Sequence, residues 1–191
     1  MSIQFRFHPQ KTIEAAAFLL KLHQKPMKYL GLLKMLYLAD RMALEEIEWP
    51  ITGDRYYSMD YGSVLSSVLD LINGKPVENA LPLWLEFIAT PELLFQDSGY
   101  YVELIKDPGT KKLCEAEEEI LQKIYQEFGH LNPFKVAEWT HDLPEWQDPH
   151  GSRIPIEIED ILKKLGKSNL EIEEIREEAI QEAYLDEVLN D

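Results

Sequence analysis

Most of the chain carries apolar residues at the three- and four-residue spacing of amphipathic helices. A first run predicts a helix over residues 12–23, with Thr12 at its N-cap position. Residues 28–47, which follow Pro26, carry a wider apolar stripe that predicts a second helix. The stripe comprises Leu30, Leu33, Leu36, Tyr37, Leu44 and Ile47.

The same spacing predicts further helices along the rest of the chain. Val64, Leu65, Val68, Leu69 and Ile72 predict a third helix, which stops at Asn73-Gly74. Three more are expected over residues 114–128, over residues 133–142 after the Asn132-Pro133 cap, and from about residue 155 to Gly166. Ser168 and Glu171 form a capping box for a last helix. Its apolar face comprises Ile172, Ile175, Ala179, Ile180, Ala183, Tyr184 and Val188.

Two stretches lack the helical period. Residues 83–105 contain LWLEFIA and YYVELI, whose bulky side chains predict a small hairpin, although LWLEFIA also suits a short helix. Asp107-Pro108-Gly109 is a turn, and Pro50 and Gly53 predict that residues 49–60 form a loop. We therefore expect a mainly α fold: a compact helical domain over residues 1–166 with a small β-hairpin, and an acidic amphipathic helix over residues 167–191.

Charge narrows the classes of partner. The 191 residues include 19 basic and 35 acidic side chains, for a net charge of −16, and residues 157–191 hold 12 acidic and 4 basic ones. Nucleic acid and anionic membranes repel such a surface, whereas a basic protein partner is attracted. Acidity that only keeps the protein soluble remains the alternative. No secretion signal and no apolar stretch of membrane-spanning length is visible, so a cytoplasmic protein is expected.

The motifs of common cofactor chemistry are absent from the sequence. There is no glycine-rich phosphate loop and no G-x-S-x-G nucleophile turn. The five histidines never occur as H-x-x-x-H, and Cys114 is the only cysteine. We therefore expect neither a cofactor nor a metal ion.

Three stretches concentrate polar groups. In LKMLYLADR, residues 33–41, Asp40 lies on the apolar stripe near Tyr37 and Arg41, either as a structural ion pair or as a charged group at a partner surface or cleft. Residues 50–62, PITGDRYYSMDYG, form either a binding loop or a loop packed down by its tyrosines.

The third stretch is WTHDLPEW, residues 139–146. On a helix, consecutive side chains point about 100° apart, so Asp142 cannot easily orient His141 as a catalytic triad requires. This segment is therefore predicted to tie a helix end to the next loop. An enzyme would require Asp40, Tyr56, Tyr61 and His141 to converge in one cleft.

Four blocks occur in an order that resembles the Panacea domain, the SocA-like, GepA-like family of antitoxin-associated proteins of bacteria and phages. They are KMLYLADR (34–41), PITGDRYYSMDYG (50–62), LCEAE (113–117) and WTHDLPEW (139–146), and the resemblance covers roughly residues 11–165. The chain departs from the family pattern at Ser63 and Leu65, where prolines are usual, and at Cys114, which replaces a capping serine. Glu145 departs from it too, since it separates Pro144 from Trp146.

The resemblance implies an antitoxin that neutralises a co-encoded toxin by direct protein–protein binding, without catalysis. Some relatives carry a separate DNA-binding domain, for which this chain has no room, so direct DNA binding is not expected. Some relatives act instead as adaptors that present a toxin to a protease. The expected partner is a cognate toxin with a basic surface, in a complex that also permits homo-oligomers. The positions that match the family motifs, with a possible role in toxin binding, are Tyr37, Asp40, Arg41, Thr52, Gly53, Asp54, Arg55, Tyr56, Tyr61, Gly62, Thr140, His141 and Trp146.

The surface that meets the toxin stays open at this point. The hypothesis is that residues 50–62, the His141–Trp146 segment or the acidic C-terminal helix supplies the contact. Alternatively, the four blocks are scaffold and a variable surface makes the contact.

Overall fold

The structure is a computed structural model that describes residues 2–89 and 101–190. Its helices are α1 (Pro9–His23), α2 (Tyr29–Glu46), α3 (Ser66–Ile72), α4 (Ala80–Phe87), α6 (Glu115–Phe128), α7 (Pro133–His141), α8 (Ile158–Lys164) and α9 (Asn169–Asn190). Its strands are β1 (Met27–Lys28), β2 (Tyr56–Met59), β3 (Gly62–Leu65), β4 (Ile88–Ala89), β5 (Tyr101–Leu104) and β6 (Ile154–Ile156). The prediction of a mainly α fold is confirmed.

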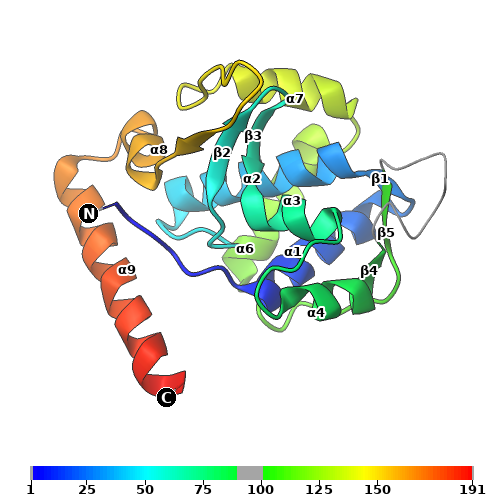
Figure 1. Cartoon of the computed structure of the whole chain (residues 1–191), viewed down its shortest axis with the longest axis horizontal. Helices are drawn as coiled ribbons and strands as arrows, with labels where there is room; N and C mark the ends of the chain where they lie inside the picture. Colours follow the sequence, from blue (N-terminus) through cyan, green and yellow to red (C-terminus); the bar gives the residue numbers. More distant parts are fainter. Residues whose placement is uncertain (1, 90–100, 191) are drawn as a thin grey trace.

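Helix α2 runs through the middle of the molecule (Figure 1). It packs against α1, α6, α7, α8 and strand β3, so every residue from Gly31 to Asp40 is buried. The apolar stripe predicted for this helix is therefore only part of its buried surface. Two ionisable side chains, Lys34 and Asp40, are buried in it as completely as the leucines.

Two small antiparallel sheets flank this core in the described residues. One has the strand order β3-β2-β6, with Tyr56 opposite both Leu65 and Ile156. The other has the order β1-β5-β4, with Met27 opposite Val102 and Ile88 opposite Leu104. The first sheet matters for the site, because it connects residues 50–65 to the segment that follows α7.

The prediction of a loop over residues 49–60 was wrong for its second half. Residues 56–59 form strand β2, which pairs with β3, and Val64 and Leu65 belong to β3 and not to the third helix. The physical reason is a period-two pattern within a short run: Tyr56 and Ser58 are buried, while Tyr57 and Met59 are partly exposed. A strand of four residues gives a weaker sequence signal than the turn residues around it, so the loop was predicted instead.

The predicted hairpin over residues 83–105 is present in part. Strands β4 and β5 pair antiparallel, but the first part of LWLEFIA belongs to helix α4, as the alternative interpretation had it. The middle of that predicted hairpin, residues 90–100, lies outside the described residues. The side chain of Trp84 is fully buried, and it anchors α4 to the core.

Two helix boundaries also differ from the prediction. Helix α1 begins at Pro9, with His8 as the N-cap, because proline suits the first helical position; Thr12 is buried one turn inside the helix. The helix expected from residue 155 begins at Ile158, because residues 154–156 pair with β2 as strand β6.

The caps predicted for the last helices are confirmed. The Asn132 side chain accepts a hydrogen bond from the Phe134 N–H at 3.0 Å. Ser168 and Glu171 exchange side-chain and backbone bonds at 2.7 and 3.3 Å, which is the capping box of α9. Among the described residues, no helix has both the length and the apolar character that a bilayer crossing requires.

Candidate functional site

Asp40 is completely buried, and its carboxylate is the acceptor for three donors. The Thr52 N–H donates at 2.9 Å, the Thr52 hydroxyl donates to the other oxygen, and the Tyr56 hydroxyl donates at 3.0 Å. Burial raises the pKa of the Asp40 carboxyl to about 7, although these hydrogen bonds oppose the shift. Asp40 therefore fastens the start of the 50–62 segment onto α2, and the ion pair expected at this site does not include it.

Arg41 forms the buried ion pair, and its partner is Glu145. The Arg41 Nε donates to Glu145 Oε1 at 2.7 Å, and the Tyr37 hydroxyl donates to the same oxygen at 2.9 Å. The Glu145 side chain is 0% exposed and that of Arg41 is 16% exposed. Burial, followed by the Glu145 charge, raises the pKa of Tyr37 well above its usual value.

The two groups of bonds meet through a ring contact. The rings of Tyr37 and Tyr56 pack edge to face, with centroids 5.6 Å apart. We call the resulting set the buried polar network, and it comprises Tyr37, Asp40, Arg41, Thr52, Tyr56 and Glu145. It joins α2, the hairpin segment and the loop after α7, which are far apart in the sequence.

Lys34 is another buried ionisable group on α2, and it was not predicted as a site residue from the sequence. Its Nζ donates to the Ser63 carbonyl at 2.6 Å. Burial lowers the pKa of Lys34 to about 7. The same corner explains Gly62, because a Cβ there would overlap the Thr140 hydroxyl and crowd Lys34 Nζ. Gly62 and Thr140, from two different motif blocks, therefore allow α7 to approach β3 closely.

The Thr52-Gly53-Asp54 part of the motif also serves the fold. Asp54 accepts bonds from the N–H groups of Ser67 and Val68, both at 2.9 Å, and so caps helix α3. Burial raises the pKa of Asp54, against the effect of these backbone donors. Gly53 has a positive φ of 67°, and a Cβ there would collide with the Arg6 carbonyl.

Of the remaining motif residues, Tyr61, His141 and Trp146 lie around the tip of the β2–β3 hairpin, whereas Arg55 lies at its other end, directly before β2. His141 Nε2 lies 3.0 Å from the Asp60 carbonyl, and the Trp146 indole N–H donates to the Met59 carbonyl at 3.2 Å. The His141 and Trp146 rings pack against each other, with centroids 4.3 Å apart. Tyr61 is 65% exposed, and its ring contacts Phe134 of α7. Arg55 is exposed as well.

These positions do not bring together the groups that an enzyme would need. Asp40 and Tyr56 bond to each other in the core, whereas Tyr61 points toward solvent and His141 is held by the backbone of the hairpin tip. A hollow of about 690 Å³ beside the N-terminal segment includes Tyr56 in its lining but none of the other three. Within the described ranges, no three His, Cys, Asp or Glu side chains are arranged to hold a metal ion.

Two residues of this site, Lys34 and Glu145, were not singled out as site residues from the sequence. Glu145 appeared only as an extra residue between Pro144 and Trp146. One signal could have pointed to it: Arg41 lies beside the apolar stripe of α2, and an arginine that is mostly buried needs a carboxylate partner. Lys34 carried the same kind of signal, because it lies next to Leu33 on a helix that is buried on most sides.

Comparison with known protein families identifies the family of this chain. The model of the family described as "Antitoxin SocA-like, Panacea domain" matches residues 32–147, which include the whole buried polar network. No curated protein matches the chain, and no solved structure does. Because the family model covers more than half of the sequence, the chain belongs to the SocA-like Panacea antitoxin domain family.

Proposed function

We propose that this chain is the antitoxin of a bacterial or phage toxin–antitoxin system and neutralises a co-encoded toxin by direct protein–protein binding. The observation that carries the proposal is the family match over residues 32–147. The geometry agrees with a binding protein, because the buried motif side chains bond to one another in the core.

Most motif residues, in this proposal, hold the scaffold on which a toxin-binding surface is displayed. Tyr37, Asp40, Thr52, Asp54 and Tyr56 are at most 3% exposed, so they cannot reach a partner without unfolding. Arg41 is partly exposed but pairs with Glu145, and four other motif residues remain accessible wholly or in part: Arg55, Tyr61, His141 and Trp146. These four stay predicted contact residues within the motif, whereas the buried ones act through the fold.

The charge of the chain supports a basic partner surface. A net charge of −16 attracts a toxin whose surface carries lysines and arginines, and it speeds the encounter at low salt. A toxin that acts on RNA would present such a surface, which the antitoxin would then cover. The proposal therefore includes no direct contact between this chain and nucleic acid, and it places the complex in the cytoplasm.

The experiment is co-expression of the chain with each adjacent open reading frame, with growth, co-purification and toxin abundance measured together. The proposal predicts that one neighbour arrests growth alone and is harmless with this chain. It also predicts that this neighbour co-purifies with the chain and stays abundant in the rescued cells. Rescue with disappearance of the toxin would instead indicate an adaptor for a protease. The absence of a toxic neighbour, or rescue without any complex, would overturn direct neutralisation.

A further inference from the structure

The outward side of α9 changes character along its length. Helix geometry places Glu173, Glu174, Glu177 and Glu178 on one side, and all four are exposed. Past Ala179 the same side becomes mainly apolar, with Ile180, Tyr184, Leu185, Val188 and Leu189 between 54% and 79% exposed around Gln181. The single apolar face predicted for this helix is therefore wrong beyond Ala179. We call the exposed apolar residues, Ile180, Tyr184, Leu185, Val188 and Leu189, the distal apolar face.

The side of α9 that faces the body of the protein changes from apolar to acidic along the helix. Ile172, Ile175 and Ala179 are buried in the core, and α9 packs there against α8. Farther along, Glu182 lines a hollow of about 530 Å³ with Arg6 and His8, and Asp186 pairs with Arg6 at 2.9 Å. The distal half of α9 thus turns its acidic side toward the body and its apolar side outward.

This arrangement leaves apolar side chains at the edge of the molecule. Figure 1 shows α9 along one edge, with its C-terminal end beyond the rest of the fold. The Arg6–Asp186 pair is partly exposed, and such pairs contribute little to stability, so it does not explain the apolar residues opposite it. A helix of about this length that exposes apolar residues over several turns is typical of recognition by a partner groove.

We propose that the distal apolar face of α9 is the anchor that docks the toxin, and that the toxin offers an apolar groove with lysines or arginines at one end. The inference rests on the proposed function and names the surface that performs it. Tyr184 and its apolar neighbours would fill the groove, while the four glutamates one or two turns earlier would meet the basic end.

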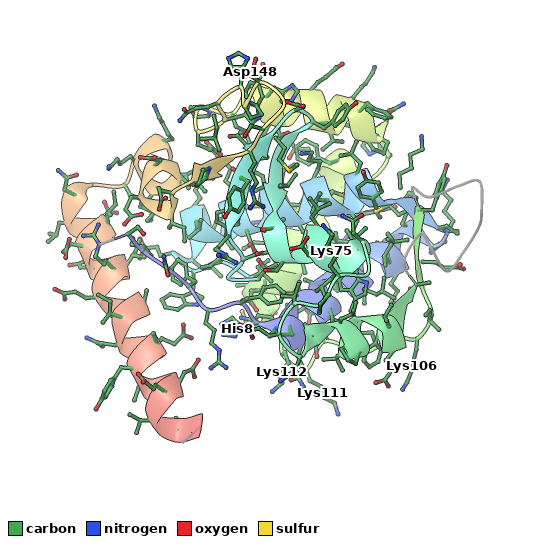
Figure 2. The ribbon with its side chains drawn as sticks, viewed as in Figure 1. His8, Lys75, Lys106, Lys111, Lys112 and Asp148 are labelled. Carbon is green, nitrogen blue, oxygen red and sulfur yellow. The ribbon has the colours of Figure 1, made fainter. Side chains whose placement is uncertain are left out.

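Charge complementarity favours such a partner over a second copy of this chain. Between Asn169 and Asn190, α9 carries eight acidic residues and a single basic one, Arg176. Two α9 helices packed in parallel would set glutamates against glutamates. A fully overlapped antiparallel pair would set glutamates against the apolar face. Arg176 already pairs with Glu173, whereas Lys75, over α3, and Lys106, beside α4, lie away from α9 (Figure 2).

The position of α9 in the sequence also suits this role. The family model ends at residue 147, whereas α9 begins at Asn169. A partner surface outside the matched residues can change from one relative to another while the buried polar network is kept.

The test uses the full chain and the neighbouring gene product that arrests growth in the experiment above. The main variant replaces Ile180, Tyr184 and Val188 by serine, which should leave the fold intact because all three side chains are more than half exposed. A matched control, Ile105→Ser, removes an apolar side chain that is 59% exposed and directly follows β5, a strand at the other edge of the molecule from α9 (Figure 1). A second variant, Glu174→Lys with Glu177→Lys, reverses the acidic end of the same side. Circular dichroism and thermal unfolding verify each variant.

We expect the triple variant to bind the toxin roughly tenfold more weakly or worse and to lose growth rescue, while Ile105→Ser behaves like the wild type. The charge-reversal variant should associate more slowly, with a weaker dependence on salt. Tyr61→Ala, at the hairpin tip, serves as the comparison: if it abolishes binding while the triple variant binds normally, the inference is overturned and direct neutralisation stands.

Two further outcomes are decisive. If the chain alone forms a dimer in sedimentation velocity, and the triple variant is a monomer, the face belongs to a second copy and the inference is overturned. If the wild-type chain binds and rescues no adjacent gene product, the proposed function itself fails, and this outcome is recognised before any variant is compared.

Discussion

Replacing Glu145 by glutamine should test whether the loop after α7 is fastened to α2 by the buried polar network. The substitution keeps the size of the side chain and removes its charge. Glutamine Oε1 can still accept the bond from the Tyr37 hydroxyl, whereas Arg41 loses its anionic partner. The substitution therefore tests the contribution of the negative charge at residue 145 while the size of the side chain is kept.

The expected loss of stability follows from the burial of both groups. Removing one partner of a buried ion pair costs about 3–5 kcal/mol, because the remaining charge is left uncompensated. Arg41 is 16% exposed, so water can reach it in part, and the retained Tyr37 bond lowers the cost further. We therefore expect the free energy of unfolding to fall by roughly 2–3 kcal/mol, which corresponds to a Tm lower by roughly 5–10 °C for a chain of this size.

The assay is urea unfolding of the purified chain, with Glu119→Gln on the exposed side of α6 as the control. Arg41→Met and the double variant complete a cycle, whose coupling free energy should be at least about 1 kcal/mol. A loss below about 0.5 kcal/mol for Glu145→Gln, or additive effects in the cycle, would refute the reasoning. At a temperature where Glu145→Gln is folded, it should still neutralise the toxin, because the residue acts through the scaffold.

Two further predictions concern the Lys34 corner. Because the pKa of Lys34 falls to about 7 on folding, the unfolded chain binds the proton more tightly between pH 7 and its ordinary value, and stability should rise with pH in that window. Urea unfolding at pH 7.5 and 9.5 should show a gain of up to about 1 kcal/mol per pH unit that Lys34→Met lacks; equal slopes in the two proteins would contradict the buried, shifted lysine. Gly62→Ala should cost roughly 2–4 kcal/mol, because the new Cβ overlaps the Thr140 hydroxyl at a positive φ of 85°. Gly151→Ala has a similar φ of 81° but open space around it, so it should cost only about 1 kcal/mol; an equal loss for both would show that the close approach of α7 is not the cause.

Local signals in the sequence were enough to predict much of this fold. The Asn132 and Ser168 caps depend on residues within one turn, and the structure confirms them. The spacing of α2 predicts part of its buried surface, including Leu33, Leu36, Tyr37 and Leu44. The β2–β3 hairpin was not predicted because its strands are short and lie between turn residues. Strand β2 also pairs with β6, about 100 residues later, and a contact so distant in the sequence leaves no local signal.

The partners of the polar residues could not be predicted, since they come from distant parts of the chain. Asp40 lies beside Arg41 in the sequence, yet it bonds to Thr52 and Tyr56, and Arg41 reaches Glu145. Adjacent residues on a helix point in different directions, so only the tertiary fold decides which acid meets which base. The exposed end of α9 was not predicted for a similar reason: past Ala179 the apolar residues lie on the side away from Ile172 and Ile175, and only the tertiary fold decides which side the core covers.

The most direct measurement of the central claim is a calorimetric titration of the purified chain into the purified growth-arresting protein encoded beside it, with no other protein present. The account predicts saturable binding with defined stoichiometry and sub-micromolar Kd, and a complex that elutes as one species. Growth rescue in cells with no heat of binding and no co-elution of the purified proteins would contradict it, because neutralisation would then require a further component.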